Sequence, residues 1–378
     1  MSDRSNRVRQ LLAAGQSVWL DFISRDLIGS GQLAQLIEKD GLRGMTSNPS
    51  IFEKAVSSGN AYDDEIVALA RQGLDAGHIF DRLAVADVSA ACHEFNRVYE
   101  QTGGADGFVS IEVSPRLARE TEKTLTEAHR LATAVACPNV MVKIPATKEG
   151  IPAVRRALAD GLNINITLMF SLADYEAVAE AYLQALEERV AGGKPIENIH
   201  SVASFFVSRI DTLVDSWLEE KAKESGPRAG RILDLRGKLA VANSRLAYER
   251  FAQILSSDRW TALADRGATV QRLLWASTST KNPSYDDLLY VDTLIGPHTV
   301  NTLPEATFAA FNDHGTVART IDDDLDGARA HMQALADAGI DVSAAAAELQ
   351  VDGVDLFVKS FDHVVGIVEQ RRATLVAR

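Results

Sequence analysis

Short runs in which apolar and polar residues alternate recur along the chain, separated by longer segments with helical periodicity. Successive side chains of a strand point to opposite faces, so each alternating run indicates a strand with two different faces. Strands separated by helices are typical of βα units, whose parallel sheet the helices cover. The expected strands are Val18 to Phe22, the segment around Gly44-Met45-Thr46, Phe108 to Val113, Asn139 to Ile144, Asn163 to Leu168, Ser201 to Val207, Arg272 to Ala276 and, with the weakest pattern, Thr299-Val300-Asn301.

Eight strands with intervening helices predict an α/β fold, a single (β/α)8 TIM barrel. Apolar residues follow helical spacing from Leu83 to Tyr99 and from Asp174 to Val190. We expect two helices between the second and third strands, and further helices from about Asp322 to the C-terminus. The triplet Asp322-Asp323-Asp324 suits a helix N-terminus, and it fits a solvated turn equally well. No low-complexity linker divides the chain, so residues 1–378 are expected to form one domain.

Lys143 is the only charged residue in the run Asn139-Val140-Met141-Val142-Lys143-Ile144-Pro145. Alternation puts Val140 and Val142 on one face of this strand and Lys143 on the other. A lysine on the inner side of a covered strand is costly unless it is paired or used, and burial favours the neutral amine. A neutral amine is the nucleophile that attacks a carbonyl carbon. Lys143 is therefore a candidate Schiff-base lysine.

Polar residues also occupy one face of most other expected strands, most clearly in Asn163-Ile164-Asn165-Ile166-Thr167-Leu168. A sheet with one solvated face explains such alternation without any function. Strands separated by helices form a covered sheet, however, and branched aliphatic residues normally fill a barrel interior. We therefore expect these polar side chains to converge on a site inside the barrel. They are Asp21, Thr46, Asn48, Ser110, Glu112, Ser114, Lys143, Asn163, Asn165, Thr167 and Ser204.

A buried lysine accompanied by carboxylates supports a specific chemistry. The amine attacks a ketone to form a carbinolamine and then an iminium, which withdraws electrons while an adjacent carbon–carbon bond breaks or forms. One carboxylate deprotonates a substrate hydroxyl, and a second moves protons as the carbinolamine forms and loses water. Asn and Ser side chains hold the hydroxyl groups of a polyol. The cluster predicts carbon–carbon bond chemistry on sugars.

Two cationic residues follow adjacent late strands. Arg209 comes just after the sixth expected strand, and Ser277 and Lys281 come just after the seventh. Barrels often bind phosphate with the loops that follow their late strands. In the alternative interpretation, Arg209 and Lys281 are surface charges whose aliphatic stems pack against the protein. The residues by themselves leave both interpretations open.

Composition and charge narrow the class of protein. The 378 residues are 46% hydrophobic and carry a formal net charge of −13, which argues against a nucleic-acid-binding surface. No apolar run approaches membrane-spanning length, and the polar N-terminus leads into no signal segment. The two cysteines, Cys92 and Cys137, form neither a disulfide framework nor a zinc-like spacing. We expect a cytoplasmic protein that binds no metal, nucleic acid or membrane, and that is a monomer or homodimer.

Several motifs resemble those of the transaldolases, in the same order along the chain. They are Gly44-Met45-Thr46-Ser47-Asn48-Pro49-Ser50-Ile51-Phe52, Ser110-Ile111-Glu112-Val113, Val142-Lys143-Ile144-Pro145-Ala146-Thr147 and Asn163-Ile164-Asn165-Ile166-Thr167-Leu168-Met169-Phe170-Ser171. The resemblance spans strands one to seven and is weak at the C-terminus. It implies a class I aldolase-type barrel of the pentose phosphate pathway that needs no cofactor and transfers a dihydroxyacetone unit between sugar phosphates. The implied donors are sedoheptulose 7-phosphate or fructose 6-phosphate, and the acceptors glyceraldehyde 3-phosphate or erythrose 4-phosphate.

The resemblance also implies a role for each matching residue. Lys143 matches the Schiff-base lysine, and Asp21 matches the general acid/base that acts on the C4 hydroxyl. Glu112 matches a carboxylate that works through a catalytic water, with Thr167 placing that water. Asn48, Asn165 and Ser204 match the groups that hold the dihydroxyacetone moiety, Thr46 and Phe206 match pocket-lining residues, and Arg209 and Ser277 match phosphate ligands.

The chain departs from the family pattern at two places. Many members have Asp-Ala-Thr where this chain has Gly44-Met45-Thr46, and an arginine two residues past the serine of strand seven, where this chain has Ser279. Lys281 is the candidate to make that phosphate contact, although an ammonium group is a point charge and cannot form the bidentate fork of a guanidinium.

Three other functions are weighed against this one. A fructose-6-phosphate aldolase would release free dihydroxyacetone, and Glu112 argues against it because the related aldolases generally lack this carboxylate. The eight histidines form no HxH or HExxH pattern, which argues against a metal-dependent hydrolase. His200 and His298 fit structural or exposed roles better. A sugar-phosphate-sensing barrel without catalysis would need to lose Lys143, Asp21 or Glu112, and all three are present.

Overall fold

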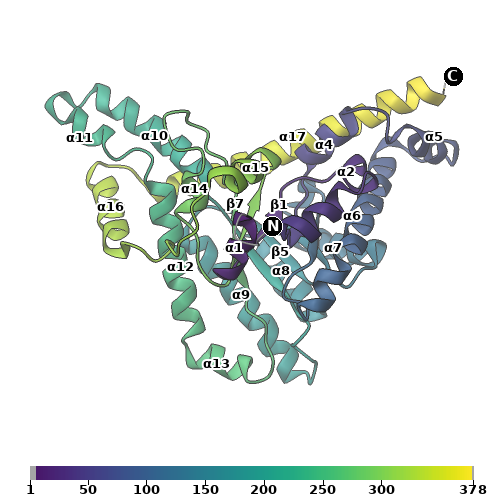
Figure 1. Ribbon diagram of the computed structural model, residues 1–378, viewed down its shortest axis with the longest axis horizontal. Coiled ribbons are helices and arrows are strands. Elements are labelled where there is room, and N and C mark those ends of the chain that lie inside the picture. The colour runs from purple at the N-terminus through teal and green to yellow at the C-terminus, as the bar shows by residue number, and fades with distance from the viewer. Residues whose placement is uncertain (1–5, 377–378) are drawn as a thin grey trace.

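The alternating segments form eight parallel strands that close into one barrel in chain order, with β8 pairing back to β1. This computed structural model describes residues 6–376 and confirms the predicted (β/α)8 barrel (Figure 1). The strands are β1 (Gln16–Leu20), β2 (Gly44–Met45), β3 (Phe108–Glu112), β4 (Val140–Pro145), β5 (Ile164–Met169), β6 (Ser201–Phe206), β7 (Arg272–Ala276) and β8 (Thr299–Leu303).

Every predicted strand is present, and β7 has the predicted bounds, but most ends are shifted by one or two residues. The first strand ends at Leu20, so Asp21 lies just beyond it, at the mouth of the barrel. Asn163 was predicted to open the fifth strand, and this is wrong. Its side chain donates to the carbonyl oxygen of Pro138 (3.0 Å) and accepts from the amide of His200 (3.0 Å), which holds it in the loop before β5.

The helices surround the barrel, and both predicted helical segments lie inside longer helices. The α-helices are α1 (Arg7–Ala13), α2 (Arg25–Gly29), α3 (Gln32–Gln35), α4 (Pro49–Ser57), α5 (Asp63–Arg71), α6 (Ala76–Gln101), α7 (Thr121–Val135), α8 (Gly150–Asp160), α9 (Leu172–Ala191), α10 (Ser208–Lys223), α11 (Ala229–Leu233), α12 (Leu239–Leu255), α13 (Asp258–Ala264), α14 (Leu289–Asp292), α15 (Glu305–His314), α16 (Leu325–Asp337) and α17 (Val342–Val376). A π-helical turn spans Leu36–Asp40, and 3₁₀ turns span Pro115–Leu117 and Gly226–Arg228.

Three α-helices, not the predicted two, lie between β2 and β3. One of the three is α4, which begins directly after β2 at Asn48-Pro49, a pair that is also typical of turns. Asn48 instead caps α4, its side chain accepting from the amide of Ile51 (3.0 Å), and Pro49 occupies the first turn, where its missing N–H costs nothing. At the other end of the chain, Asp324 caps α16 by accepting from the amide of Gly327 (3.0 Å), as the acidic triplet suggested.

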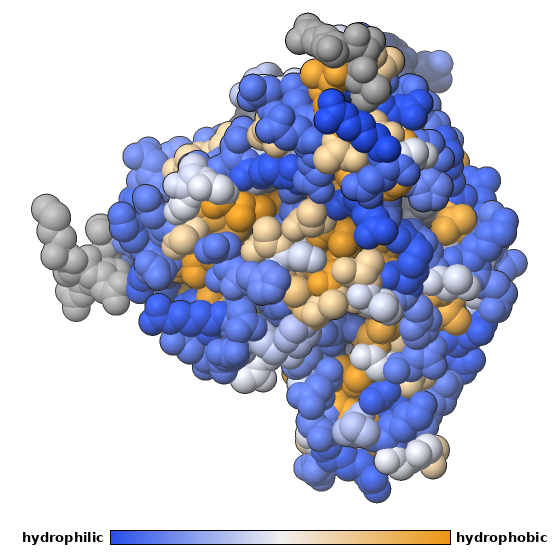
Figure 2. Space-filling view, turned by 90° about the vertical axis from the view of Figure 1, so that its right-hand side faces the viewer, coloured by the Kyte–Doolittle hydropathy of each residue, from blue (hydrophilic) through white to orange (hydrophobic). Residues whose placement is uncertain are grey.

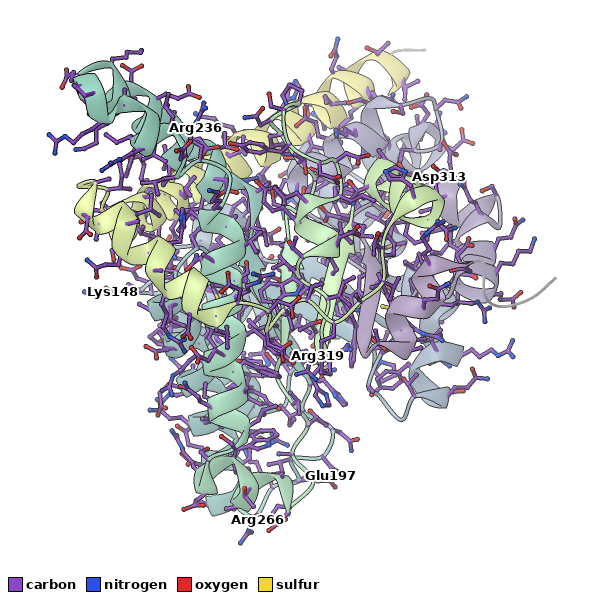
Figure 3. All side chains as sticks on the ribbon, turned by 60° about the vertical axis from the view of Figure 1, so that its left-hand side comes forward. Lys148, Glu197, Arg236, Arg266, Asp313 and Arg319 are labelled. Carbon is purple, nitrogen blue, oxygen red and sulfur yellow. The ribbon has the colours of Figure 1, made fainter. Side chains whose placement is uncertain are left out.

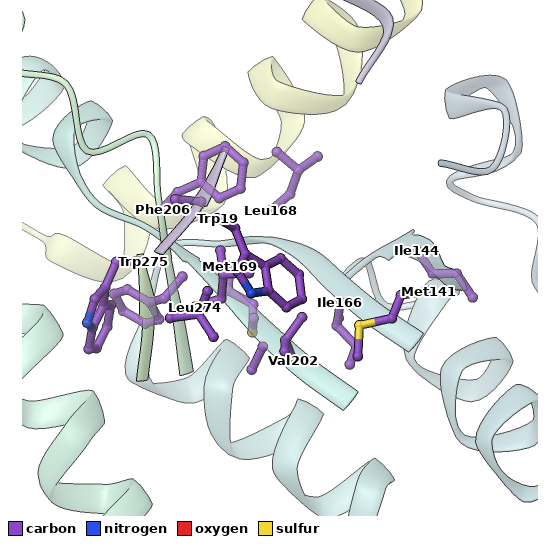
Figure 4. Packing of buried hydrophobic residues seen from close by; sticks show 14 of the residues in the cluster. Trp19, Met141, Ile144, Ile166, Leu168, Met169, Val202, Phe206, Leu274 and Trp275 are labelled. Atoms are coloured by element: carbon purple, nitrogen blue, oxygen red, sulfur yellow. The ribbon is translucent and has the colours of Figure 1, made fainter. Parts of the chain in front are cut away.

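The core has two layers, one inside the barrel and one between the strands and the helices. Figure 4 shows part of this packing around Trp19, Met169 and Trp275, all fully buried. Trp19 pairs with Gly44 in the neighbouring strand, and a β-carbon on Gly44 would lie 2.6 Å from the indole ring. The glycine that departs from the family pattern therefore makes room for a tryptophan at this level of the barrel.

The last helix, α17, packs against α4, α5, α6 and α10 and contacts the end of β5. Figure 1 shows it running from the side of α10 to the side of α5. Figure 2 shows the right-hand side of the view in Figure 1, where the surface is largely hydrophilic and carries apolar patches. Charged residues such as Lys148, Glu197 and Arg266 project from the periphery (Figure 3). Within residues 6–376, no helix combines the length and the apolar character needed to cross a bilayer.

Candidate active site

A cavity of about 670 Å³, open to solvent, lies at the carboxyl ends of the strands and collects most of the predicted site residues. Its walls come from β1, β2, β4, β5, β6, β7 and β8 or the residues that follow them, and from α17. The predicted residues that line it are Asp21, Thr46, Asn48, Lys143, Thr167, Ser204, Phe206, Arg209, Ser277 and Lys281. Residues far apart in sequence thus meet in one place, as the polar inner faces predicted.

Lys143 stands in the wall of this cavity with its side chain almost completely buried. Strands β3 and β4 pair with Glu112 opposite Lys143, and the Lys143 Nζ lies 3.3 Å from the Glu112 Oε2. The same ammonium donates to the carbonyl oxygen of Ser47 (3.3 Å) and lies 5.4 Å from the centre of the Phe357 ring. The amine is therefore held by Glu112, Ser47 and Phe357 in the wall of the cavity.

Two carboxylates flank Lys143, and burial raises the pKa of both. For Asp21 the rise is opposed by the charge of Lys143 and by a hydrogen bond from the Thr46 hydroxyl, which donates to Asp21 Oδ1 at 2.7 Å. For Glu112 it is opposed by the charge and hydrogen bond of Lys143, and Asp21 adds to it. Carboxyl groups whose pKa lies above the ordinary range are suited to proton transfer near neutral pH.

Glu112 does not line the cavity that holds Lys143. It lines a second, mainly apolar cavity together with Asn48, Phe80 and Phe361, and reaches the first cavity through its ion pair with Lys143. A carboxylate in this position contacts the amine directly and would contact a bound sugar only through an intermediary group.

The amide and hydroxyl groups form two sets. Asn165 is fully buried, donating to Ser110 Oγ (3.0 Å) and accepting from Ser204 Oγ (2.6 Å), so these three side chains form one chain across the barrel. Thr167 differs, because its buried hydroxyl has no hydrogen-bond partner among the described residues. A bulge in β5 next to it, where Leu168 has a φ of +60°, breaks the register with β6 between Ile166 and Met169. Thr167 therefore presents a free hydroxyl to the cavity.

Cations gather at the outer end of the cavity. Arg209 lies in the first turn of α10, 5.4 Å over the Phe206 ring, and burial lowers its pKa. The Lys281 Nζ donates to Ser279 Oγ (2.6 Å), and partial burial followed by the charges of Arg209 and Lys54 lowers the pKa of Lys281. Ser277 contacts Ser208 at the start of α10, with 3.1 Å between the hydroxyl oxygens. The arrangement suits an anion such as phosphate.

Several lining residues were missed from the sequence, and two of them contact predicted site residues. Phe357 comes from α17, and Thr302 comes from β8, where its hydroxyl lies 2.8 Å from that of Thr46. Alternation does not mark Thr302, because it shares a face of β8 with Val300, while the polar residues Thr299 and Asn301 lie on the other face. No local pattern marks Phe357, because it lies in an apolar stretch of a long helix. Over residues 6–376, no three His, Cys, Asp or Glu side chains group as the ligands of a metal ion would.

Comparison with known proteins agrees with this geometry. The sequence profile of the family described as transaldolase/fructose-6-phosphate aldolase matches residues 18–367. A transaldolase from Thermobifida fusca is 47% identical over 97% of this chain and 98% of its own length. A transaldolase from Trichodesmium erythraeum is 44% identical over the same shares of the two chains. One from Neisseria meningitidis is 44% identical over 93% of this chain and 97% of its own. The chain belongs to the transaldolase/fructose-6-phosphate aldolase family.

Proposed function

We propose that this chain is a transaldolase, a transferase that moves a dihydroxyacetone unit from one sugar phosphate to another. The observation that carries the proposal is the buried Lys143 amine, 3.3 Å from a carboxylate, in a cavity whose outer end holds Arg209 and Lys281. A Schiff-base nucleophile thus stands at one end of the cavity and a candidate phosphate site at the other. The relatives that match nearly the whole chain carry the same activity in their names.

The reaction begins when the Lys143 amine attacks the C2 carbonyl of the donor. The carbinolamine loses water to give an iminium, and Glu112 exchanges the required protons through a water that the free hydroxyl of Thr167 holds. Asp21 then accepts the proton of the C4 hydroxyl. The C3–C4 bond breaks, its electrons pass to the iminium to form an enamine, and the shortened aldose phosphate leaves.

The second half of the reaction reverses these steps with another aldehyde. The enamine carbon attacks the acceptor carbonyl, Asp21 returns the proton to the new hydroxyl, and water releases the product from Lys143. Asn48, Asn165 and Ser204 hold the dihydroxyacetone hydroxyls, between walls formed by Thr46 and Phe206. Arg209, Ser277 and Lys281 bind the phosphate of sedoheptulose 7-phosphate, fructose 6-phosphate or the matching acceptors.

Transfer is favoured over release of free dihydroxyacetone. Glu112 pairs with Lys143, whereas the related aldolases generally lack this carboxylate, and the relatives compared above are named transaldolases. The two unpaired cysteines, Cys92 and Cys137, fit a reducing compartment such as the cytoplasm. We further propose that the enzyme works without a cofactor, as a monomer or homodimer.

Borohydride trapping tests the covalent step. The protein is incubated with fructose 6-phosphate, reduced, digested and analysed by peptide mass spectrometry. We expect a reduced three-carbon adduct on the peptide that contains Lys143, because the iminium is reduced after the aldose phosphate has left. Lys143→Met is the control and should show neither adduct nor turnover while remaining folded by circular dichroism. A folded wild-type protein without an adduct on any lysine would contradict the proposal.

A further inference from the structure

The segment from Thr278 to Leu288 joins β7 to α14 and carries Ser279 and Lys281 to the edge of the active-site cavity. Most of its side chains are exposed or half-buried. Some of its contacts are local, such as the Thr280 hydroxyl donating to the carbonyl oxygen of Asp286 (2.8 Å), and others reach the barrel, such as the Thr278 hydroxyl donating to Asn301 Oδ1 on β8 (3.0 Å). Its position relative to Arg209 depends on the contacts that this region makes with α10, the helix that carries Arg209.

Two aspartates of α10 bond to this region, and the first turn of α10 carries Arg209. Asp215 accepts from the amide of Gly237 (2.9 Å) with one oxygen and from the Tyr285 hydroxyl (2.7 Å) with the other. Asp211 accepts from the amide of Ala240 (2.7 Å) and from the Tyr290 hydroxyl (2.8 Å) in the same way. The two carboxylates lie one helical turn apart, so they repeat one pattern.

Each carboxylate therefore connects three pieces of the chain: α10, the start of α12, and the region after β7. Both aspartates and Tyr290 are buried. The Tyr285 ring lies over Gly237, whose φ is +67°, and a β-carbon there would come within 2.6 Å of the ring. Burial raises the pKa of Asp211 to about 7 and also raises the pKa of Asp215. The tyrosine hydroxyls therefore donate most strongly above neutral pH, where both carboxyl groups are ionised and water is excluded from them.

Lys281 needs such support because it stands among like charges. Arg209 and Lys54 both disfavour its ammonium form, Asp21 offsets them only in part, and its Nζ donates to Ser279, a neutral neighbour on the same segment. Without an anion between them, repulsion drives Lys281 and Arg209 apart. A segment with so few buried side chains holds the two cations together only if it is fixed on both sides of Lys281. Ser277, bonded to Ser208, lies on one side, and Tyr285 and Tyr290 lie on the other.

We propose that Asp211 and Asp215, with Tyr290 and Tyr285, are positioning residues that hold Lys281 and Ser277 at a fixed distance from Arg209 and so preorganise the phosphate site. This inference rests on the proposed function. None of the four side chains lines the cavity; they act through the segment that carries Lys281. Their contribution is therefore confined to substrates that bear phosphate, and the chemistry at Lys143 does not depend on them.

Tyr285→Phe and Tyr290→Phe each remove one hydroxyl and preserve the ring. We expect the KM for fructose 6-phosphate to rise about tenfold in each, since a hydrogen bond to a charged group is lost, with kcat changed less than twofold. Inorganic phosphate, as a competitive inhibitor, should weaken by a similar factor. Trapping of Lys143 by dihydroxyacetone and borohydride, which involves no phosphate, should proceed at the wild-type rate.

Tyr248→Phe is the matched control, because the Tyr248 hydroxyl donates to the carbonyl oxygen of Pro297 (3.2 Å) and to neither aspartate of α10. It should leave both KM and phosphate inhibition unchanged. Asp215→Asn, which preserves volume, repeats the test should a tyrosine variant fold poorly. Wild-type KM and phosphate inhibition in the variants, or an equal loss of dihydroxyacetone trapping, would overturn the inference. A wild-type protein that neither traps nor transfers would instead overturn the proposed function.

Discussion

Thr46 links the carboxylate of Asp21 to the barrel. Its hydroxyl donates to Asp21 Oδ1 (2.7 Å) and lies 2.8 Å from the hydroxyl of Thr302 on β8. Burial raises the pKa of Asp21, while Lys143 and this hydrogen bond lower it, so Thr46 limits the size of the shift. A residue first assigned only to the pocket wall therefore also sets the pH range in which Asp21 is ionised.

Thr46→Val removes that hydroxyl at nearly constant volume. The charged form of Asp21 loses a donor, so the pKa of Asp21 rises further and the carboxylate takes up its proton at a higher pH. Asp21 must be ionised to accept the proton of the C4 hydroxyl. The acid limb of the kcat/KM profile should therefore move to higher pH. Thr46→Ser retains the hydroxyl and should follow the wild-type profile; a Val variant that does the same would remove Thr46 from this role.

At the scale of residues, alternation and spacing located much of the site. The polar inner faces predicted that Lys143, Thr167 and Ser204 would meet, and they do. The roles assigned to them came from the resemblance and stay predictions. Phe357 could not be found in this way, since a pattern reveals which faces of a helix are apolar but not where in the fold that helix docks. The hydrogen bonds from Tyr290 to Asp211 and from Tyr285 to Asp215 were missed for the same reason.

At the scale of elements, α17 is fastened to the catalytic end of the barrel. Gln350 donates to the carbonyl oxygens of Ala146 (3.0 Å) and Leu168 (3.3 Å), just past β4 and at the bulge of β5. Ser360 contacts Ser50 on α4, with 2.7 Å between the hydroxyl oxygens. Between these points, Gly353 lets the helix approach closely, because a β-carbon there would lie 2.9 Å from Leu168 Cδ2. The helix thus seats Phe357 over Lys143.

Gly353→Ala tests this close approach, with Gly366→Ala on the same helix as the matched control. Alanine in place of an unconstrained helical glycine stabilises by about 0.5–1 kcal/mol, and nothing lies within 4 Å of a β-carbon at Gly366. At Gly353 the added methyl displaces the fully buried Leu168, and overpacking of this kind costs about 1–3 kcal/mol. In urea titrations Gly366→Ala should gain stability and Gly353→Ala should lose it. Equal gains would show that α17 has room at this point.

The elements themselves were largely predictable, because the strands carry a period of two and the longer helices a period near four. The errors fall where a side chain overrides the pattern. Asn163 continues the alternation of β5 but bonds to the loops on both sides of it, and Asn48 resembles a turn residue but caps α4. Such hydrogen bonds depend on partners that only the folded barrel supplies.

At the scale of the whole molecule, a buried ion pair joins strands at the amino end of the barrel, opposite the active site. The Arg272 Nη2 lies 2.8 Å from the Asp106 Oδ1, with 15% and 8% of the two side chains exposed. The Arg272 Nη1 donates to Ser17 Oγ (2.8 Å), and Ser17 Oγ donates to Asp106 Oδ2 (2.7 Å). The network connects Arg272 of β7, Ser17 of β1 and Asp106, which lies in the loop before β3. It therefore links three distant parts of the chain at the amino end of the barrel.

Removal of one partner of this pair should destabilise the whole barrel. Arg272→Met leaves the Asp106 carboxylate buried without its counter-ion, which costs about 3–5 kcal/mol of unfolding free energy. Replacing both partners, as in Arg272→Met with Asp106→Leu, removes the uncompensated charge as well, and should restore most of that loss. Urea unfolding of the two single variants and the double variant gives the coupling energy. If the losses of unfolding free energy in the two single variants add up to the loss in the double variant, packing and not the ion pair stabilises the amino end of the barrel. Turnover per folded molecule should stay near wild type in all three, because the network lies at the opposite end of the barrel from Lys143.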